Sequence, residues 1–248
     1  MPRTATLGAS ANRGMTLIEV MIVVLIIGVI GSVAVPNVMA ARVKNNEAAA
    51  VSTMRTLRTS QTQFQQGVRA DVDADGIGEF GLLRELSGAA PVRTSRNGGS
   101  TGSLLMPALL ASSFGQMNSD GEVVRAGYHF KVFLPGERGS ALGERSLTQL
   151  ESSGPTSIDS DLCETNWSAY AWPADGEGMG DHTYFINQDG AMTRSEIDAR
   201  SRRGANGVVV SEAGGALAPG AAGDRSSMLG QVALDARGRD GRNWQRVR

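Results

Sequence analysis

The chain has 248 residues, of which 41% are hydrophobic, 5% aromatic and 32 are glycine, a composition that predicts one globular domain with long loops and a modest core. Its formal net charge of -1 creates no overall field that would attract nucleic acid, so nucleic acid is not an expected partner. The single cysteine, Cys163, excludes an intramolecular disulfide.

The first predicted element is an apolar helix from Met15 to Val35, which is interrupted only by Thr16, Glu19, Ser32 and two glycines. At about 1.5 Å per residue this segment is about 30 Å long, which is the thickness of the hydrocarbon layer of a bilayer. The sequence therefore predicts a single membrane-spanning helix.

A short polar leader, residues 1–14, precedes this helix and carries Arg3 and Arg13 as its only charged side chains. Positive charge before an apolar span places the leader in the cytoplasm and the remainder of the chain across the membrane. Three kinds of N-terminus fit this pattern: a secretory signal peptide, a permanent anchor, or a prepilin leader with its helix.

Two observations separate these alternatives. The small-residue segment 38–40 favours a secretory signal, but the apolar run is longer than the core of such a signal. Glu19 also opposes a passive anchor, because a carboxylate inside hydrocarbon costs about 2.5 to 3.5 kcal/mol and usually has a function.

The segment 13–19, Arg-Gly-Met-Thr-Leu-Ile-Glu, resembles the processing site of type IV pilins and type II secretion pseudopilins. The resemblance implies that prepilin peptidase cleaves between Gly14 and Met15 and methylates the new amino group of Met15. It extends to Gly28 and Pro36, which stand where family members often carry a glycine and a proline.

Glu19 would then have a role in assembly. After cleavage the amino group of Met15 is cationic and lies one helical turn from a carboxylate in hydrocarbon. Pairing of an incoming subunit's amino group with the Glu19 of its neighbour removes two costly unpaired charges and sets the filament register.

Pro36 removes a backbone hydrogen bond, so we expect a kink or local melting of the helix over residues 33–36.

Residues 37–66 continue as an amphipathic helix that ends before Gly67. Residues of the predicted buried face recur at spacings of three or four: Val51, Met54, Leu57, Gln61 and Phe64. We expect this face to pack on a sheet.

An acidic segment follows the helix, with Asp71, Asp73 and Asp75 at alternate positions before a glycine. This spacing matches the opening of a calcium loop, in which such oxygens converge on the ion. Leu82 occupies the place of the closing glutamate, so Glu79 or Glu85 would have to substitute. A solvated acidic turn without a metal is the alternative, because turns also favour aspartate and glycine.

Two hairpins are predicted in the head, residues 67–200. The first pairs residues 123–124 with 128–134, and the second pairs 169–172 with 183–187. The expected fold is α+β and pilin-like, with the second half of the long helix packed on an antiparallel sheet.

The last region, residues 201–248, is rich in Gly, Ala and Arg, and we expect a disordered solvated tail. Its final 24 residues contain six arginines and two aspartates, so contact with DNA phosphates or an acidic partner is the alternative.

Two histidines and the absence of a recognisable triad, metalloprotease or phosphate-loop pattern predict that the chain is not an enzyme. The resemblance implies a structural subunit of a type II secretion pseudopilus or type IV pilus. Its expected partners are prepilin peptidase, other subunits, an inner-membrane assembly platform and, before assembly, lipid. The alternative is a minor subunit at a filament tip that binds DNA, a surface or a secretion substrate. No cofactor other than calcium is expected.

Overall fold

The computed structural model describes residues 14–96, 102–144, 150–152, 157–174, 179–196, 213–219 and 225–247. The predicted leader lies outside these residues except for Gly14. The chain divides after Ala41 into two units, which we call the stem (residues 14–41) and the head (residues 42–247) and describe separately.

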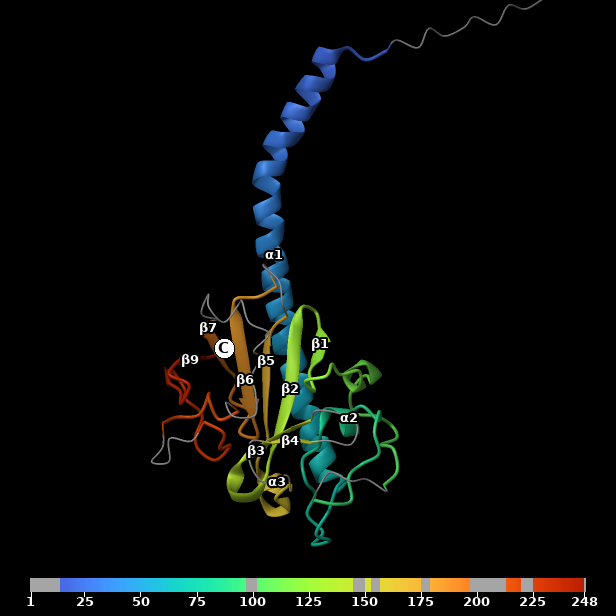
Figure 1. Ribbon diagram of the computed structural model, residues 1–248, viewed down its shortest axis with the longest axis vertical. Helices are drawn as coiled ribbons and strands as arrows, with labels where there is room; N and C mark the ends of the chain where they lie inside the picture. Colours follow the sequence, from blue (N-terminus) through green and yellow to red (C-terminus); the bar gives the residue numbers. More distant parts are fainter. Residues whose placement is uncertain are drawn as a thin grey trace, which may run out of the picture. The chain divides into compact units, whose positions relative to one another are not determined.

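The stem consists of the first half of helix α1 (Leu17–Gln66) (Figure 1). Among the described residues α1 alone is long and apolar enough to cross a membrane. Its apolar side chains are exposed on every side of the helix between Met15 and Met39, so no other described residue covers the stem. A helix that is apolar all round needs lipid or other protein around it. The helix runs through Gly28 and Pro36 without interruption, so the prediction of local melting is wrong.

The head is an antiparallel sheet with helices on it, and the α+β prediction is confirmed. Its helices are the second half of α1, the short α2 (Leu83–Leu86) and α3 (Ser160–Thr165), and the 3-10 turns η1 (Ser112–Gly115) and η2 (Glu137–Gly139). Its strands are β1 (Val123–Arg125), β2 (Tyr128–Pro135), β3 (Ala141–Glu144), β4 (Leu150–Ser152), β5 (Ser168–Pro173), β6 (His182–Asn187), β7 (Thr193–Glu196), β8 (Ala236–Arg237) and β9 (Asn243–Arg246).

The strand order in the described residues is β4-β3-β2-β5-β6-β7-β9-β8, and β1 pairs with β2. Both predicted hairpins are confirmed. Val123 pairs with Phe130 in the first hairpin, and Ala169 pairs with Ile186 across β5 and β6. Turn residues and alternating side chains were therefore sufficient to locate these strands.

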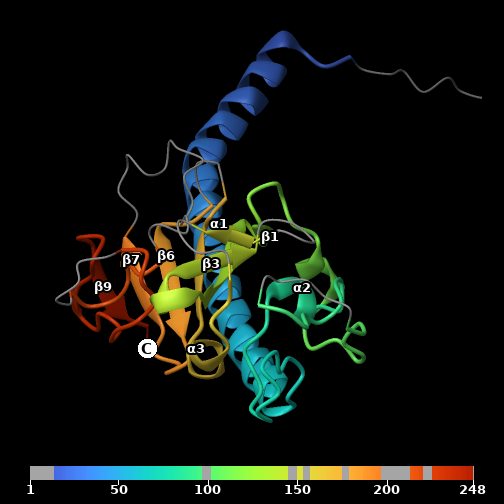
Figure 2. The same ribbon diagram turned by 60° about the horizontal axis from the view of Figure 1, so that its bottom comes forward.

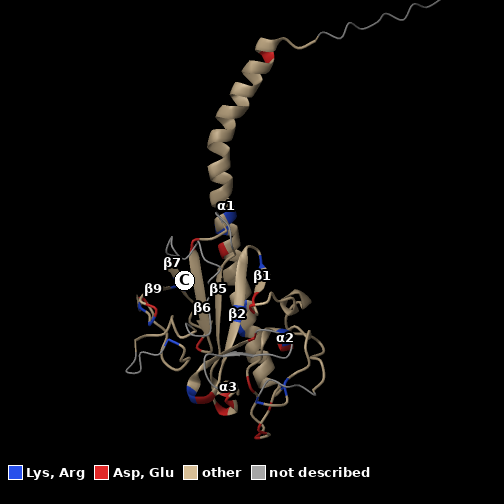
Figure 3. Cartoon of the chain, viewed as in Figure 1, with Lys and Arg blue, Asp and Glu red and all other residues tan. Residues whose placement is uncertain are grey.

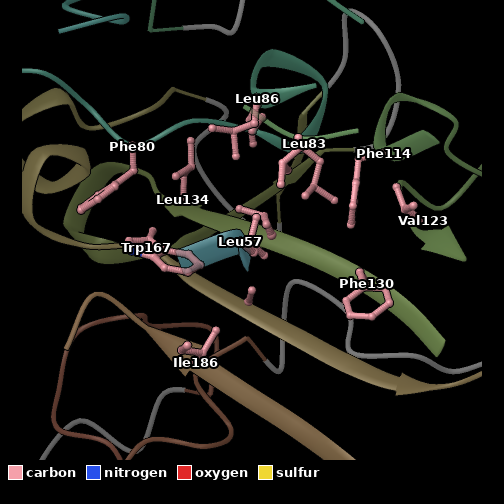
Figure 4. Packing of buried hydrophobic residues seen from close by; sticks show 14 of the residues in the cluster. Leu57, Phe80, Leu83, Leu86, Phe114, Val123, Phe130, Leu134, Trp167 and Ile186 are labelled. Carbon is pink, nitrogen blue, oxygen red and sulfur yellow. The ribbon is translucent and has the colours of Figure 1, made fainter. Parts of the chain in front are cut away.

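The main core lies between α1 and one face of the sheet (Figure 2). The predicted stripe of α1 is buried at Met54, Leu57, Gln61 and Phe64, whereas Val51 is half-buried. Figure 4 shows Leu57 among side chains from the segment after α1, such as Phe80, and from the sheet. Gln61 ties α1 to the segment that follows it by exchanging two hydrogen bonds with the backbone of Gly81.

A second core lies on the opposite face of the sheet and is made by the region after residue 212. Trp244 of β9 is 1% exposed and contacts the rings of Tyr170 and Phe185. The Tyr170 hydroxyl donates to the carbonyl of Ala213 and accepts from the amide of Ala216. The prediction of a disordered tail is wrong for the described parts of this region. The burial of Trp244 outweighs the polar composition around it.

A buried network of charged side chains connects α2 to its surroundings. Arg93 forms ion pairs of 2.8 Å with Glu79 and 2.6 Å with Glu85, and all three side chains are at least 96% buried. Burial, followed by the nearby Glu85 carboxylate, raises the pKa of Glu144 to about 8. Glu144 is therefore largely neutral near pH 7, and its 3.9 Å approach to Arg84 is a weak contact.

Candidate functional site

The first turn of α1 holds the residues of the predicted processing and assembly site. Thr16 precedes the helix, and its Oγ1 accepts a hydrogen bond of 3.3 Å from the amide of Glu19. The amide of Thr16 in turn donates to Oε2 of Glu19 at 3.4 Å. This reciprocal pair is a capping box, which satisfies two amides that the start of a helix leaves unpaired.

Thr16 is a residue of this site that we did not single out from the sequence. The signal was present, because a threonine followed three residues later by a glutamate before an apolar run is the pattern of a capping box. Glu19 therefore stabilises the start of its own helix. It also remains solvent-exposed in the single chain.

The predicted cleavage bond lies in an accessible position. Gly14 and Met15 precede the helix, and Met15 is 67% exposed. A Cβ added at Gly14 would meet no other atom within 4 Å, so packing in the single chain does not require glycine there. The same is true of Gly28 within α1. Packing among the described residues therefore does not explain a small residue at either position.

Apart from Glu19, the stem has no charged side chain within its described residues, as the uniform colour of that helix in Figure 3 shows. The next charged residue is Arg42, at the start of the head. A lone carboxylate in an apolar helix costs free energy when the helix is in hydrocarbon, and a cationic partner reduces that cost.

The acidic segment after α1 forms a compact loop in which two of the carboxylates bind the backbone. Asp71 accepts hydrogen bonds from the amides of Asp75 and Gly76, and Asp75 accepts one from the amide of Ile77. Gly76 has a φ of 89°, which favours glycine, as the sequence predicted. These hydrogen bonds give Asp71 and Asp75 a structural role in the loop that requires no metal ion.

The structure brings Asp71, Asp73 and Asp75 together and adds two residues of α3. One carboxylate oxygen from each of the first three lies within 4.8 Å of the others, and the same holds for Asp73 with Asp161 and Glu164. We call these five residues the acidic cluster. Sequence reasoning missed Asp161 and Glu164, because nothing in the local pattern connects them to a loop some 90 residues earlier.

Two oxygens in the acidic cluster are buried without a hydrogen-bond partner within the described ranges, namely Oδ1 of Asp73 and Oε1 of Glu164. Burial and the neighbouring Asp75 carboxylate raise the pKa of Asp73. Burial, followed by Asp75 and Asp73, also raises the pKa of Glu164. The carboxylates therefore repel one another and lack a cationic partner among the described residues.

Glu79 and Glu85, the expected substitutes for the closing glutamate, do not join the acidic cluster. Glu79 accepts a hydrogen bond from the amide of Val72 with one oxygen and pairs with Arg93 through the other. Glu85 pairs with the same arginine and caps α2 through the amide of Leu82. Both carboxylates support the buried network beneath the loop.

Comparison with known proteins identifies the N-terminal segment. Residues 9–35 match the family described as Prokaryotic N-terminal methylation motif. The N-terminal part of the chain is therefore similar to that of type IV pilins. This pilin-like chain is also 34% identical over 88 residues to the Type IV major pilin protein PilA of Myxococcus xanthus (strain DK1622). That alignment covers 36% of this chain and 39% of the relative, so the chain spans well under two thirds of the relative's length. No solved structure matches the pilin-like chain.

Proposed function

We propose that this pilin-like protein is a structural, non-enzymatic subunit of a type IV pilus. The observation that carries the proposal is the methylation motif at residues 9–35, placed directly on a helix whose apolar side chains are exposed all round. A similar segment in a type IV major pilin favours the pilus over the type II secretion pseudopilus. A minor subunit at the filament tip is the alternative branch.

In this proposal the stem first lies in the inner membrane with the head on the far side. Prepilin peptidase removes the leader at Gly14 and methylates Met15. The carboxylate of Glu19, which caps its own helix in the free subunit, then exchanges this weak bond for the cationic amino group of a neighbouring subunit. Burial of both charges in the filament makes their pairing stronger than it would be in water.

Mass spectrometry of the mature protein tests the processing step. We expect a chain that begins with a methylated Met15, and a Gly14→Val variant that keeps its leader. A mature N-terminus at Ala41, as after cleavage of an ordinary secretory signal, would contradict the proposal.

The abundance of the protein in sheared filaments separates a major subunit from a minor subunit at the tip. A major subunit dominates such filaments, whereas a tip subunit is a trace component.

We also propose that the acidic cluster binds calcium. Carboxylate oxygens are the ligands that calcium prefers, and the buried oxygens of Asp73 and Glu164 have no hydrogen-bond partner in the part of the chain that the structure describes. The participation of α3 replaces the missing closing glutamate of a linear calcium loop, so the ligands would come from two segments of the chain.

Calorimetric titration of the purified full chain with calcium alone tests this second proposal. We expect binding heat that an Asp73→Asn variant loses, because Asp73 is shared by both groups of carboxylates. A Glu196→Gln variant removes an exposed carboxylate outside the cluster and should bind as the unmodified chain does. Absence of heat in the unmodified chain would contradict the proposal.

A further inference from the structure

A groove runs along the side of the head between α1 and the strands β6, β7 and β9. It has a volume of about 460 Å³, and α1 contributes Lys44, Glu47 and Arg55 to its lining. Arg194 of β7 lies on the opposite side, and Tyr184 and Val247 complete the apolar part of the wall. We call this surface the basic groove.

The cations of the basic groove have no partner in the part of the chain that the structure describes. The side chains of Lys44, Arg55 and Arg194 form no hydrogen bond or ion pair there, and Nε of Arg194 is buried without an acceptor. The one carboxylate in the groove, Glu47, is already bound to the ring of His182 at 2.7 Å. A buried unpaired donor costs free energy, so the groove is suited to an anion.

The basic groove and the acidic cluster lie at opposite ends of the head along α1. The groove spans residues 44 to 55, and α1 continues for eleven more residues, about 16 Å, before the acidic segment begins. Figure 3 shows acidic residues gathered around α3, far from the point where α1 enters the head. The two charged surfaces therefore cannot meet within one chain.

We propose that the basic groove of one copy of this chain receives the acidic cluster of a second copy. The charges are complementary, and each surface contains polar atoms that have no hydrogen-bond partner among the described residues. Complementary patches at opposite ends of a subunit make a head-to-tail contact, which propagates into an open filament and not a closed dimer. The inference thus rests on the proposed pilus function and specifies how heads would be stacked.

A membrane headgroup fits the basic groove less well. Arg55 lies about 20 Å along α1 from Arg42, the first charged residue of the head, whereas the headgroup layer is only about 5 to 8 Å thick. A bound calcium ion does not remove the complementarity, because the five carboxylates carry more charge than one divalent cation neutralises.

Charge reversal in the full chain, expressed in the producing organism, tests the contact. Arg55 and Asp75 are both exposed. Because the Asp75 carboxylate also accepts a hydrogen bond from the amide of Ile77, the thermal stability of each purified variant is compared with that of the unmodified chain. We expect Arg55→Glu and Asp75→Arg each to lower the yield of sheared filaments at least about threefold, and the variant with both changes to recover most of the yield. Arg237→Glu, the same change at an exposed position outside the groove, should leave the yield unaltered.

A cysteine cross-link provides a second measurement. The native Cys163 is buried, so Arg55→Cys and Asp75→Cys supply the accessible thiols. Mild oxidation of filaments that carry both changes should produce covalent dimers and longer ladders, whereas either change alone should not.

The outcomes separate the inference from the function on which it rests. If the unmodified chain forms no filaments, the proposed function is wrong. If it does form them, but neither reversal lowers the yield or the combined variant fails to recover, the head-to-tail contact is wrong. A loss of membrane retention for Arg55→Glu with normal filaments would assign the groove to lipid and also overturn the contact.

Discussion

The stem and the head reverse the usual rule of burial in opposite ways. The stem exposes nearly every apolar side chain from Met15 to Met39, whereas the head buries charged groups such as Arg93 and Glu79. Buried charges are stable when their partners are inside the same fold, and exposed apolar groups are stable when their partners are other molecules. The difference indicates that the stem is built for assembly and the head for independent stability.

The largest expected effect comes from Glu19→Ala in the stem. We expect loss of filament assembly by at least about tenfold, because the incoming amino group would be transferred from lipid without its counter-ion. Cleavage after Gly14 and the thermal stability of the head should be unchanged, because the bonds of Glu19 to Thr16 support only the first turn of the stem helix. Quantification of sheared filaments beside total protein measures the effect. Normal filament yield would show that the stem assembles by apolar packing alone.

The head should respond in the opposite way to Arg93→Met. This change leaves the carboxylates of Glu79 and Glu85 buried without a cation, which costs about 3 to 5 kcal/mol of unfolding free energy. Chemical denaturation of the purified chain measures the loss. Arg58→Met, at an exposed position on α1, serves as the matched control. A loss below about 1 kcal/mol would show that the buried network is dispensable.

Trp244→Ala tests whether the late region belongs to the head. Removal of this ring opens a cavity between Tyr170 and Phe185, and we expect a cost of about 3 kcal/mol. The change should also make residues 225–247 sensitive to limited proteolysis while the hairpins stay protected. Equal protection in the variant and the unmodified chain would contradict the contribution of Trp244 to the second core.

A further effect in the head is a dependence of its stability on pH. The pKa of Glu144 is raised from 4.5 to about 8, so between these values the folded chain holds a proton that the unfolded chain releases. The unfolding free energy therefore falls as pH rises from about 4.5 to about 8. Glu144→Gln remains neutral, and it should cost less than about 1 kcal/mol at pH 5 and flatten this dependence. An unchanged slope in thermal melts across that range would contradict the raised pKa.

The parts of the molecule that could be predicted from sequence are those with local signals. The length of the apolar run defined the stem, the three- and four-residue spacing of Met54 and Leu57 defined the buried face of α1, and turn residues defined both hairpins. The contacts of the head could not be predicted where the two partners are distant in sequence. Nothing in the sequence around Arg93 indicates the two carboxylates with which it pairs. Lys44 and Arg194 likewise come to line the same groove only in the folded chain. Trp244 stands in a polar, arginine-rich segment whose average composition concealed one large apolar side chain.

The position of β9 has a consequence for how the head is completed. Thr193 of β7 pairs with Arg246, 53 residues later, so this ladder closes a long loop and should form slowly. Until it forms, β7 presents unpaired amides and carbonyls as an edge strand, which is a template for pairing with the wrong chain. The head is therefore open to pairing with the wrong chain until this ladder forms, and the contact of Trp244 with Tyr170 helps to hold β9 in its place on β7.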